Sequence, residues 1–200
     1  MQQEDISTLK NFYTSLYKKY GYDSRSTGYS VEGQQVRYGV LSQLGDVNNK
    51  TILEVGSGLG HFYQFLKKRF KSFDYTGYDI NENFVKETRD RIGPFFENRN
   101  ILMDPVKDKF DFVFSIGILN TKIKDNEATT KELMERLYQA CKKIAALSMT
   151  SIYVDKDYIH DHMFYYDPSS ILRFARQLSK KVLLIHDYLP HDFTVVLKKI

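Results

Sequence analysis

Three glycines at alternate positions follow a short apolar run, and their spacing is the clearest sign of chemistry in the chain. Residues 51–55 read as a buried strand, and Gly56, Gly58 and Gly60 come directly after it, before an amphipathic segment that begins at His61. Glycine permits positive φ and lets a ligand approach bare backbone. The pattern predicts a strand, a tight turn and a helix start, the first half of a βαβ unit with a nucleotide-type cofactor at its turn.

A carboxylate follows at the distance at which such sites contact a ribose. Residues 73–79 read as a second strand that ends in Asp79. A carboxylate roughly 20 residues beyond the last glycine can accept both ribose hydroxyls from the tip of the neighbouring strand. The alternative is an N-cap role for Asp79 in the next helix, although Asn81 is already available for that role. We interpret Asp79 as a ribose ligand.

The glycine spacing separates two kinds of cofactor site. The dinucleotide motif Gly-x-Gly-x-x-Gly or Ala, started at Gly56, places its third small residue at position 61. His61 occupies that position and would obstruct the approach of a diphosphate. The spacing therefore disfavours a nicotinamide or flavin site and the dehydrogenase function that it would serve.

Glu54 followed by Gly56-x-Gly58-x-Gly60 resembles motif I of the class I S-adenosylmethionine-dependent methyltransferases. The resemblance covers roughly residues 28–199. It implies an α/β, Rossmann-like, doubly wound seven-stranded sheet that is mostly parallel with an antiparallel strand 7, and S-adenosyl-L-methionine as the cofactor. Residues 115–120 and the tail, with Tyr153-Val154-Asp155 and His186-Asp187-Tyr188, resemble an uncharacterised branch of small bacterial methyltransferases.

The resemblance assigns cofactor contacts to the turn, to the tips of the next three strands and to one helix before the first strand. These positions are Arg37, Glu54, Gly56, Ser57, Gly58, Gly60, Asp79, Ile80, Met103, Asp104, Ser115 and Asn120. Met103 and Asp104, in a third strand expected at residues 100–105, are the positions that meet the adenine, and an ordinary turn-forming Asp-Pro is the alternative for Asp104. Arg37 could clamp the cofactor's carboxylate, or lie in solvent.

The fourth strand, expected at residues 110–120, also limits the acceptor. It lacks the Asn/Asp-Pro-Pro-Tyr/Phe motif of the methyltransferases that modify adenine or glutamine, which argues against those acceptors. A mild net charge of +4 gives no reason to expect a nucleic-acid surface. A small-molecule or glycan acceptor is favoured instead.

The order of elements predicts how these positions come together. Alternating strands and helices imply a parallel sheet with right-handed crossovers, and the short connection from residues 181–185 to residues 193–199 requires an antiparallel last strand. We expect one domain, with residues 1–45 as an N-terminal helical lid or cap and residues 46–200 as the core. Core packing is the alternative for the first helix. Cys141 is expected on the buried face of a helix that precedes a fifth strand at residues 145–153.

Ligands of such sheets bind beyond the carboxyl ends of the strands. That rule places three residues of the tail in a substrate half of the site: Tyr153, Asp155 and His186. His186 is the best-placed general base, because histidine titrates near neutrality, and a structural hydrogen-bonded histidine is the alternative. His160-Asp161-His162 has weak metal-ligand spacing without a further ligand set, so no metal is expected.

Composition and hydropathy indicate the cellular compartment of the protein. One cysteine among 200 residues excludes an internal disulfide and suits a reducing compartment. The polar, acidic start is unlike a signal peptide, and no apolar run reaches membrane-spanning length. We expect a cytoplasmic protein of open oligomeric state that transfers methyl from S-adenosylmethionine to a hydroxyl or amine. A catalytically silent S-adenosylmethionine-binding regulatory or scaffold subunit is the alternative.

Overall fold

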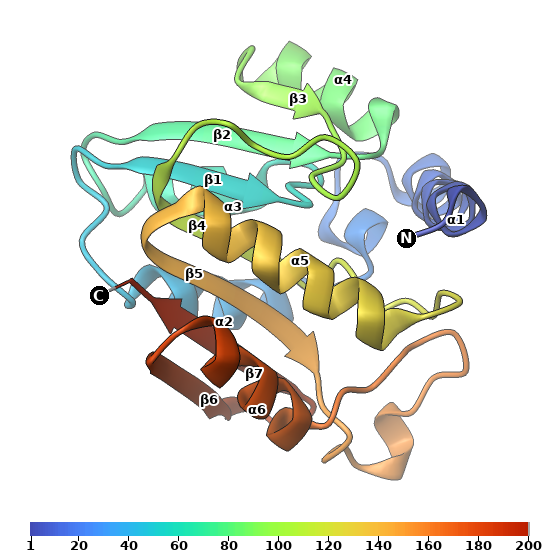
Figure 1. Cartoon of the computed structure of the whole chain (residues 1–200). Coiled ribbons are helices and arrows are strands. Elements are labelled where there is room, and N and C mark those ends of the chain that lie inside the picture. The colour runs from blue at the N-terminus through green and yellow to red at the C-terminus, as the bar shows by residue number, and fades with distance from the viewer. Residues whose placement is uncertain (200) are drawn as a thin grey trace.

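The computed structural model describes residues 1–199 and is built on one seven-stranded sheet in the order β3-β2-β1-β4-β5-β7-β6 (Figure 1). The strands are β1 (Thr51–Val55), β2 (Asp74–Asp79), β3 (Phe96–Asn98), β4 (Phe110–Ile116), β5 (Cys141–Thr150), β6 (Lys181–Leu189) and β7 (Asp192–Lys198). Every pairing is parallel except those of β7, which is antiparallel to β5 and to β6. The expected sheet with an antiparallel last strand is confirmed.

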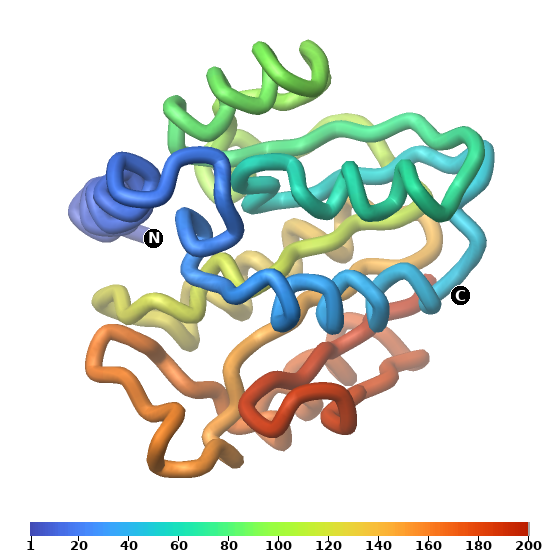
Figure 2. The backbone as a smooth tube through the Cα atoms, turned by 180° about the vertical axis from the view of Figure 1, so that it is seen from behind, coloured from blue at the N-terminus to red at the C-terminus, as the bar shows by residue number. Residues whose placement is uncertain are grey.

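Helices cover both faces of the sheet. They are α1 (Gln3–Tyr20), α2 (Val31–Ser42), α3 (His61–Lys67), α4 (Glu82–Arg91), α5 (Asn126–Ala140) and α6 (Pro168–Leu178), with 3-10 turns η1 (Ser24–Thr27) and η2 (Lys156–Tyr158). The front of Figure 1 shows α5 and α6, and the view from behind in Figure 2 shows α2 and α3. A sheet covered in this way needs strands that are apolar on both faces.

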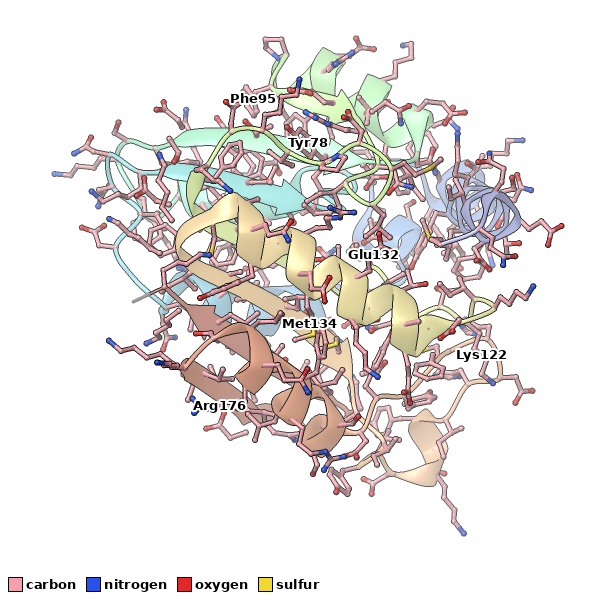
Figure 3. The ribbon with its side chains drawn as sticks, in the orientation of Figure 1. Tyr78, Phe95, Lys122, Glu132, Met134 and Arg176 are labelled. Carbon is pink, nitrogen blue, oxygen red and sulfur yellow. The ribbon has the colours of Figure 1, made fainter. Side chains whose placement is uncertain are left out.

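Two apolar clusters form the core, one on each face. The first packs α5 and α6 against the sheet, and Met134 of α5, fully buried, lies between helix and strands while Arg176 points outward from α6 (Figure 3). The second packs Phe62 and Leu66 of α3 against Ile52 and Phe114. Because neighbouring residues of a strand point to opposite faces, Leu53 and Val55 of β1 join the first cluster and Ile52 joins the second.

The third strand differs from the prediction. It lies at Phe96–Asn98, whereas residues 101–104 form turns in which the Asn100 carbonyl accepts the Met103 and Asp104 amides. Phe96 explains the position, because its buried ring covers Gly77 of β2 so closely that a Cβ on Gly77 would stand 2.5 Å from Cδ1 of Phe96. That packing fixes the pairing with β2 several residues earlier than the apolar pattern of residues 100–105 suggested.

Three other boundaries also differ. α5 ends at Ala140, so Cys141 is buried as the first residue of β5 and is not part of a helix. β4 ends at Ile116, and Gly117, with φ of +64°, turns the chain away from the sheet. β6 continues to Leu189 past an irregularity after Ile185, so His186 lies within a strand and not in a connection.

Candidate functional site

A cleft opens at the carboxyl ends of β1, β2 and β4, with about 840 Å³ of empty space that includes open solvent at its mouth. Its walls come from the strand tips, the loops after them, the segment before α2, and helices α1, α4 and α5. The lining residues are Met1, Leu9, Lys10, Tyr13, Thr27, Tyr29, Val55, Gly56, Gly58, Tyr78, Asp79, Ile80, Asn81, Phe84, Arg99, Asn100, Ile101, Leu102, Ile116, Gly117, Ile118, Leu119 and Leu133. The structure therefore brings together the glycine turn, Asp79 and Ile80, as expected.

The glycine turn lines the cleft with bare backbone. Gly56 and Gly58 have φ of +77° and +51°, which side chains rarely adopt. A Cβ on Gly56 would stand 1.9 Å from Cγ2 of Ile118, and one on Gly58 would stand 2.9 Å from Cγ2 of Thr27. Conformation and space both require glycine here. Gly60 does not line the cleft, but precedes α3 with φ of +72° and packs against Ile92.

Asp79 presents a carboxylate beside this turn. It is buried, and its oxygens accept the Gly58 and Asn81 amides, each at 2.8 Å. Burial raises the pKa of Asp79 to about 6, against the opposing effect of these amide hydrogen bonds. The group is therefore ionised at neutral pH. Because a carboxylate has about four lone-pair positions, it can still accept ribose hydroxyls.

Glu54 points away from the cleft. Its side chain is buried and accepts a hydrogen bond from the Tyr75 hydroxyl. Burial raises the pKa of Glu54 to about 8, although the Tyr75 hydrogen bond lowers it, so the carboxyl is protonated near neutrality. Ser57 and Ser115 are likewise buried without lining the cleft. These three positions support the turn and the strand tips, and the structure does not bring their side chains to a ligand.

Arg37 has another partner. It is buried, and its guanidinium forms an ion pair with Asp192, which is also buried, and lies 4.2 Å from the ring centroid of Tyr29. Arg37 does not line the cleft. Both sequence interpretations, a direct clamp on the cofactor and a solvent-exposed side chain, differ from what the structure shows.

The loop after β3 lines the cleft with residues earlier in the chain than expected. Met103 is 65% exposed, and Asp104 pairs with Arg99 at 2.7 Å; neither lines the cleft. Residues 99–102 line it instead, and the Nδ2 atom of Asn100 is buried without a hydrogen-bond partner among the described residues. The displacement of β3 from its expected position accounts for the correction. In the sequence, the short apolar run that begins after Asn100 was the signal that could have identified residues 99–102 as part of the cleft wall.

Tyr29 lines the opposite end of the cleft, where its hydroxyl contacts Asn120, a residue that does not itself line the cleft. Asn120 is buried, its Oδ1 accepts the Thr150 amide at 3.1 Å, and its Nδ2 lies 3.4 Å from the Tyr29 hydroxyl. A Cβ on Gly117 would stand 1.6 Å from that hydroxyl, so the turn after β4 leaves space for it. Tyr29 lies in a polar linker, and no sequence pattern marks it as a site residue.

The expected substrate half lies elsewhere. Ile116 at the cleft is in register with Ser148, Thr194 and Ile185 across β4, β5, β7 and β6. Three strand spacings of about 4.8 Å therefore place the neighbouring residue, His186, about 14 Å from β4. A general base must reach its proton directly or through one water. The structure does not bring His186 to the cleft.

The tail residues have structural contacts of their own. His186 Nε2 lies 2.7 Å from the Ser151 hydroxyl, and its ring centroid is 6.2 Å from that of Tyr153. Tyr153 is 62% exposed and Asp155 is also exposed. Neither lines the cleft. Within residues 1–199 no group of three or more His, Cys, Asp or Glu side chains is arranged to hold a metal ion.

Helix α1 lies across the mouth of the cleft, beyond the arrowheads of β1 and β2 (Figure 1). On the α4 side, Lys10 pairs with Glu82 at 2.5 Å and Tyr17 donates to Glu87 at 2.7 Å. On the α5 side, Asp5 accepts the Lys124 amide at 3.0 Å. The helix is thus held on both sides of the cleft. None of the described helices is both long and apolar enough to span a bilayer.

Comparison with known proteins finds methyltransferases that are similar to this chain. Residues 53–146, which run from β1 through β5, match the family model of a methyltransferase domain. Over this segment the chain is similar to methyltransferases. It is 28% identical over 158 residues to a protein named "Putative methyltransferase Rv1506c" from Mycobacterium tuberculosis, a match that covers 74% of this chain and 93% of that protein.

Solved structures share the fold across nearly the whole chain. The DhpI–S-adenosylhomocysteine complex superimposes with a TM-score of 0.73 and 13% identity, over 98% of this chain and 97% of that one. A SAM-dependent methyltransferase from Archaeoglobus fulgidus superimposes with a TM-score of 0.70 and 15% identity, over 94% of this chain and 100% of that one. The cleft of this chain has three features that fit a nucleoside: a cradle of bare backbone that a Cβ would fill, a carboxylate at the tip of β2, and an Asn100 amide nitrogen without a hydrogen-bond partner among the described residues.

Proposed function

We propose that the chain transfers the methyl group of S-adenosylmethionine to a hydroxyl or amine of a small molecule or glycan in the cleft at the ends of β1, β2 and β4. The observation that carries the proposal is the carboxylate of Asp79 beside the positive-φ backbone of Gly56 and Gly58, all three lining one cleft. An anion next to bare backbone suits a ribose and the sulfonium chain attached to it.

Strand order gives the direction of the cofactor across the cleft. Adenine, ribose and the amino-acid end follow one another in the molecule, and β3, β2, β1 and β4 follow one another in the sheet. With the ribose on Asp79, the adenine extends toward Asn100 and Ile101, and the amino-acid end extends toward Gly117 on the β4 side. Asn100, and not Met103 or Asp104, is then the residue that donates to the adenine.

The protein contributes to the reaction mainly by positioning the methyl donor and the acceptor. S-adenosylmethionine supplies an electrophilic methyl whose departure leaves a neutral thioether, so holding donor and acceptor in line accounts for most of the rate. The lining residues Tyr13, Thr27 and Phe84 offer hydroxyls and an aromatic ring next to the turn. With α1 across the mouth, a small acceptor fits better than a nucleic acid. Residues 1–45 act as the lid in this proposal, and residues 46–200 as the core.

A silent cofactor-binding subunit remains the second candidate because of one observation. No histidine lines the cleft among residues 1–199, and its one acidic side chain, Asp79, is assigned to the ribose. An acceptor group that must lose a proton would therefore release it to solvent, or would have a pKa low enough to be deprotonated already at neutral pH. The cytoplasmic location expected from the single cysteine is compatible with either candidate.

Calorimetric titration with S-adenosylmethionine, S-adenosylhomocysteine and NADH tests the proposal first. We expect saturable binding of the first two and none of NADH. A screen with methyl-labelled S-adenosylmethionine against phenols, amines and sugars then separates an enzyme from a silent subunit. Binding without any labelled product would favour the silent subunit, and binding of NADH alone would overturn the assignment.

A further inference from the structure

The hydroxyl of Tyr29, a residue that lines the cleft, is a hydrogen-bond donor for which the described residues supply no acceptor. The Oδ1 of Asn120 accepts the Thr150 amide, which identifies the other atom of that side chain as the amide nitrogen. An amide nitrogen only donates, so the Tyr29 oxygen is the acceptor in the 3.4 Å contact with it. No described residue accepts the proton of Tyr29 itself. A neighbouring hydroxyl differs, because Thr27 both donates to the Ser24 carbonyl and accepts from Gln34.

Segments far apart in the chain hold the Tyr29 ring in place. Arg37 of α2 stacks on it with a guanidinium carbon 4.2 Å from the ring centroid, and Asp192 at the start of β7 pairs with that guanidinium. Gly117 leaves the space that the hydroxyl fills. A buried ion pair of this kind contributes little net stability, but it fixes orientation. The cation on the ring face also draws electron density from the phenol and makes its proton a better donor.

The proton stays on Tyr29. Burial raises the pKa of Tyr29 far above its usual value, and the opposing effect of the Arg37 charge is smaller. A protonated phenol cannot serve as the base for an acceptor. It can donate one hydrogen bond to an oxygen of a ligand, most strongly to an anionic one.

From this geometry we infer that Tyr29 donates a hydrogen bond to the α-carboxylate of S-adenosylmethionine, with Arg37 and Asp192 as the residues that position its ring. The inference rests on the proposed function, because strand order brings the amino-acid end of the cofactor to the β4 side, where Gly117 and Asn120 surround the hydroxyl. Arg37 thus influences the carboxylate through Tyr29 rather than by a direct clamp.

The test is the affinity for two ligands that differ only in the carboxylate, S-adenosylhomocysteine and its decarboxylated form. Tyr29→Phe should weaken S-adenosylhomocysteine about tenfold, the usual effect of losing a hydrogen bond to a charged group, and change the decarboxylated ligand less than about twofold. Tyr188→Phe is the matched control, since it removes a phenol near Asp192 that bonds Thr194 and does not line the cleft. It should leave both affinities unchanged.

A merely structural role would give a different result. Equal weakening of both ligands by Tyr29→Phe, or an unchanged affinity for S-adenosylhomocysteine in a variant with an unaltered melting temperature, would overturn the inference. Introduced into the wild type, Arg37→Lys should lower the ratio of the affinity for S-adenosylhomocysteine to that for its decarboxylated form. Introduced into the Tyr29→Phe variant, it should leave that ratio unchanged. If the wild type binds neither ligand, the proposed function itself fails, and that result is visible before any variant is made.

Discussion

The two ends of the sheet use their strand tips in different ways. At the ends of β1, β2 and β4, the backbone of the glycine turn, the carboxylate of Asp79 and the phenol of Tyr29 from the segment before α2 line one cleft. At β5 and β6 the polar groups bond one another: the Thr150 carbonyl accepts the Tyr166 amide, the His191 carbonyl accepts the Ser151 amide, and the Ser151 hydroxyl bonds His186. Both ends carry polar residues past their strands, but in the first these groups line a cleft, whereas in the second several of them are paired with one another.

Of the variants proposed for the cleft at β1, β2 and β4, Gly56→Ala should weaken ligand binding most. The added methyl would meet Ile118 at 1.9 Å on backbone with φ of +77°, so the turn must move and the cradle is lost. We expect S-adenosylhomocysteine affinity to fall by more than about a hundredfold, measured by calorimetry. Gly39→Ala in α2 is the control, because nothing lies within 4 Å of its Cβ and alanine favours a helix. Binding retained by Gly56→Ala would separate the turn from the cofactor.

Asp79 should make binding depend on pH. The ionised carboxylate accepts ribose hydroxyls, and burial sets its pKa at about 6, so affinity should be full at pH 7.5 and fall as the pH drops through 6. Linkage gives about a tenfold loss by pH 5. Asp79→Asn should bind about tenfold less tightly at pH 7.5, with the remaining affinity flat between pH 5 and 7.5. A wild-type affinity that is level over this range would show that the ribose does not use Asp79.

Glu54 should affect stability rather than binding. Its pKa is raised from 4.5 to about 8 by burial, so the folded state holds a proton that the unfolded chain releases between these values. The free energy of unfolding should therefore fall as the pH rises through this window, with a slope of up to about 1.4 kcal/mol per pH unit. Glu54→Gln should reduce that slope, measured by urea unfolding at several pH values, and leave S-adenosylhomocysteine affinity unchanged. A large loss of affinity would return Glu54 to the site.

His186→Asn should have the smallest effect. It removes a hydrogen bond to Ser151 at the far side of the sheet, a loss of about 1 kcal/mol in the free energy of unfolding. Methyl transfer to the acceptor found in the screen should continue within about twofold of the wild-type rate. A hundredfold slower rate with unchanged cofactor affinity would show that the second region contributes to catalysis after all.

Local patterns identified the parts of the site that depend on backbone. The glycine turn and Asp79 follow from strand, turn and helix signals over a few residues, and the order of elements predicted the sheet. Tyr29 could not be found in this way, because its position depends on Arg37, Gly117 and Asn120 from other segments. Because β3 was expected at residues 100–105, the predicted adenine contact fell on Met103 and Asp104, and because β6 was expected to end at Ile185, His186 was predicted to lie in a loop.

The attachment of α1 has a kinetic consequence. Thr14 of α1 accepts a hydrogen bond from the side-chain amide of Asn81, and the backbone amide of Asn81 donates to Asp79. Asn81 therefore connects the covering helix to the carboxylate that we propose binds the ribose. In the proposed function, spent cofactor leaves past that helix. We expect its release, rather than the methylation step, to limit turnover, so that rapid mixing with an acceptor gives a burst of one product per protein molecule before the slower steady rate.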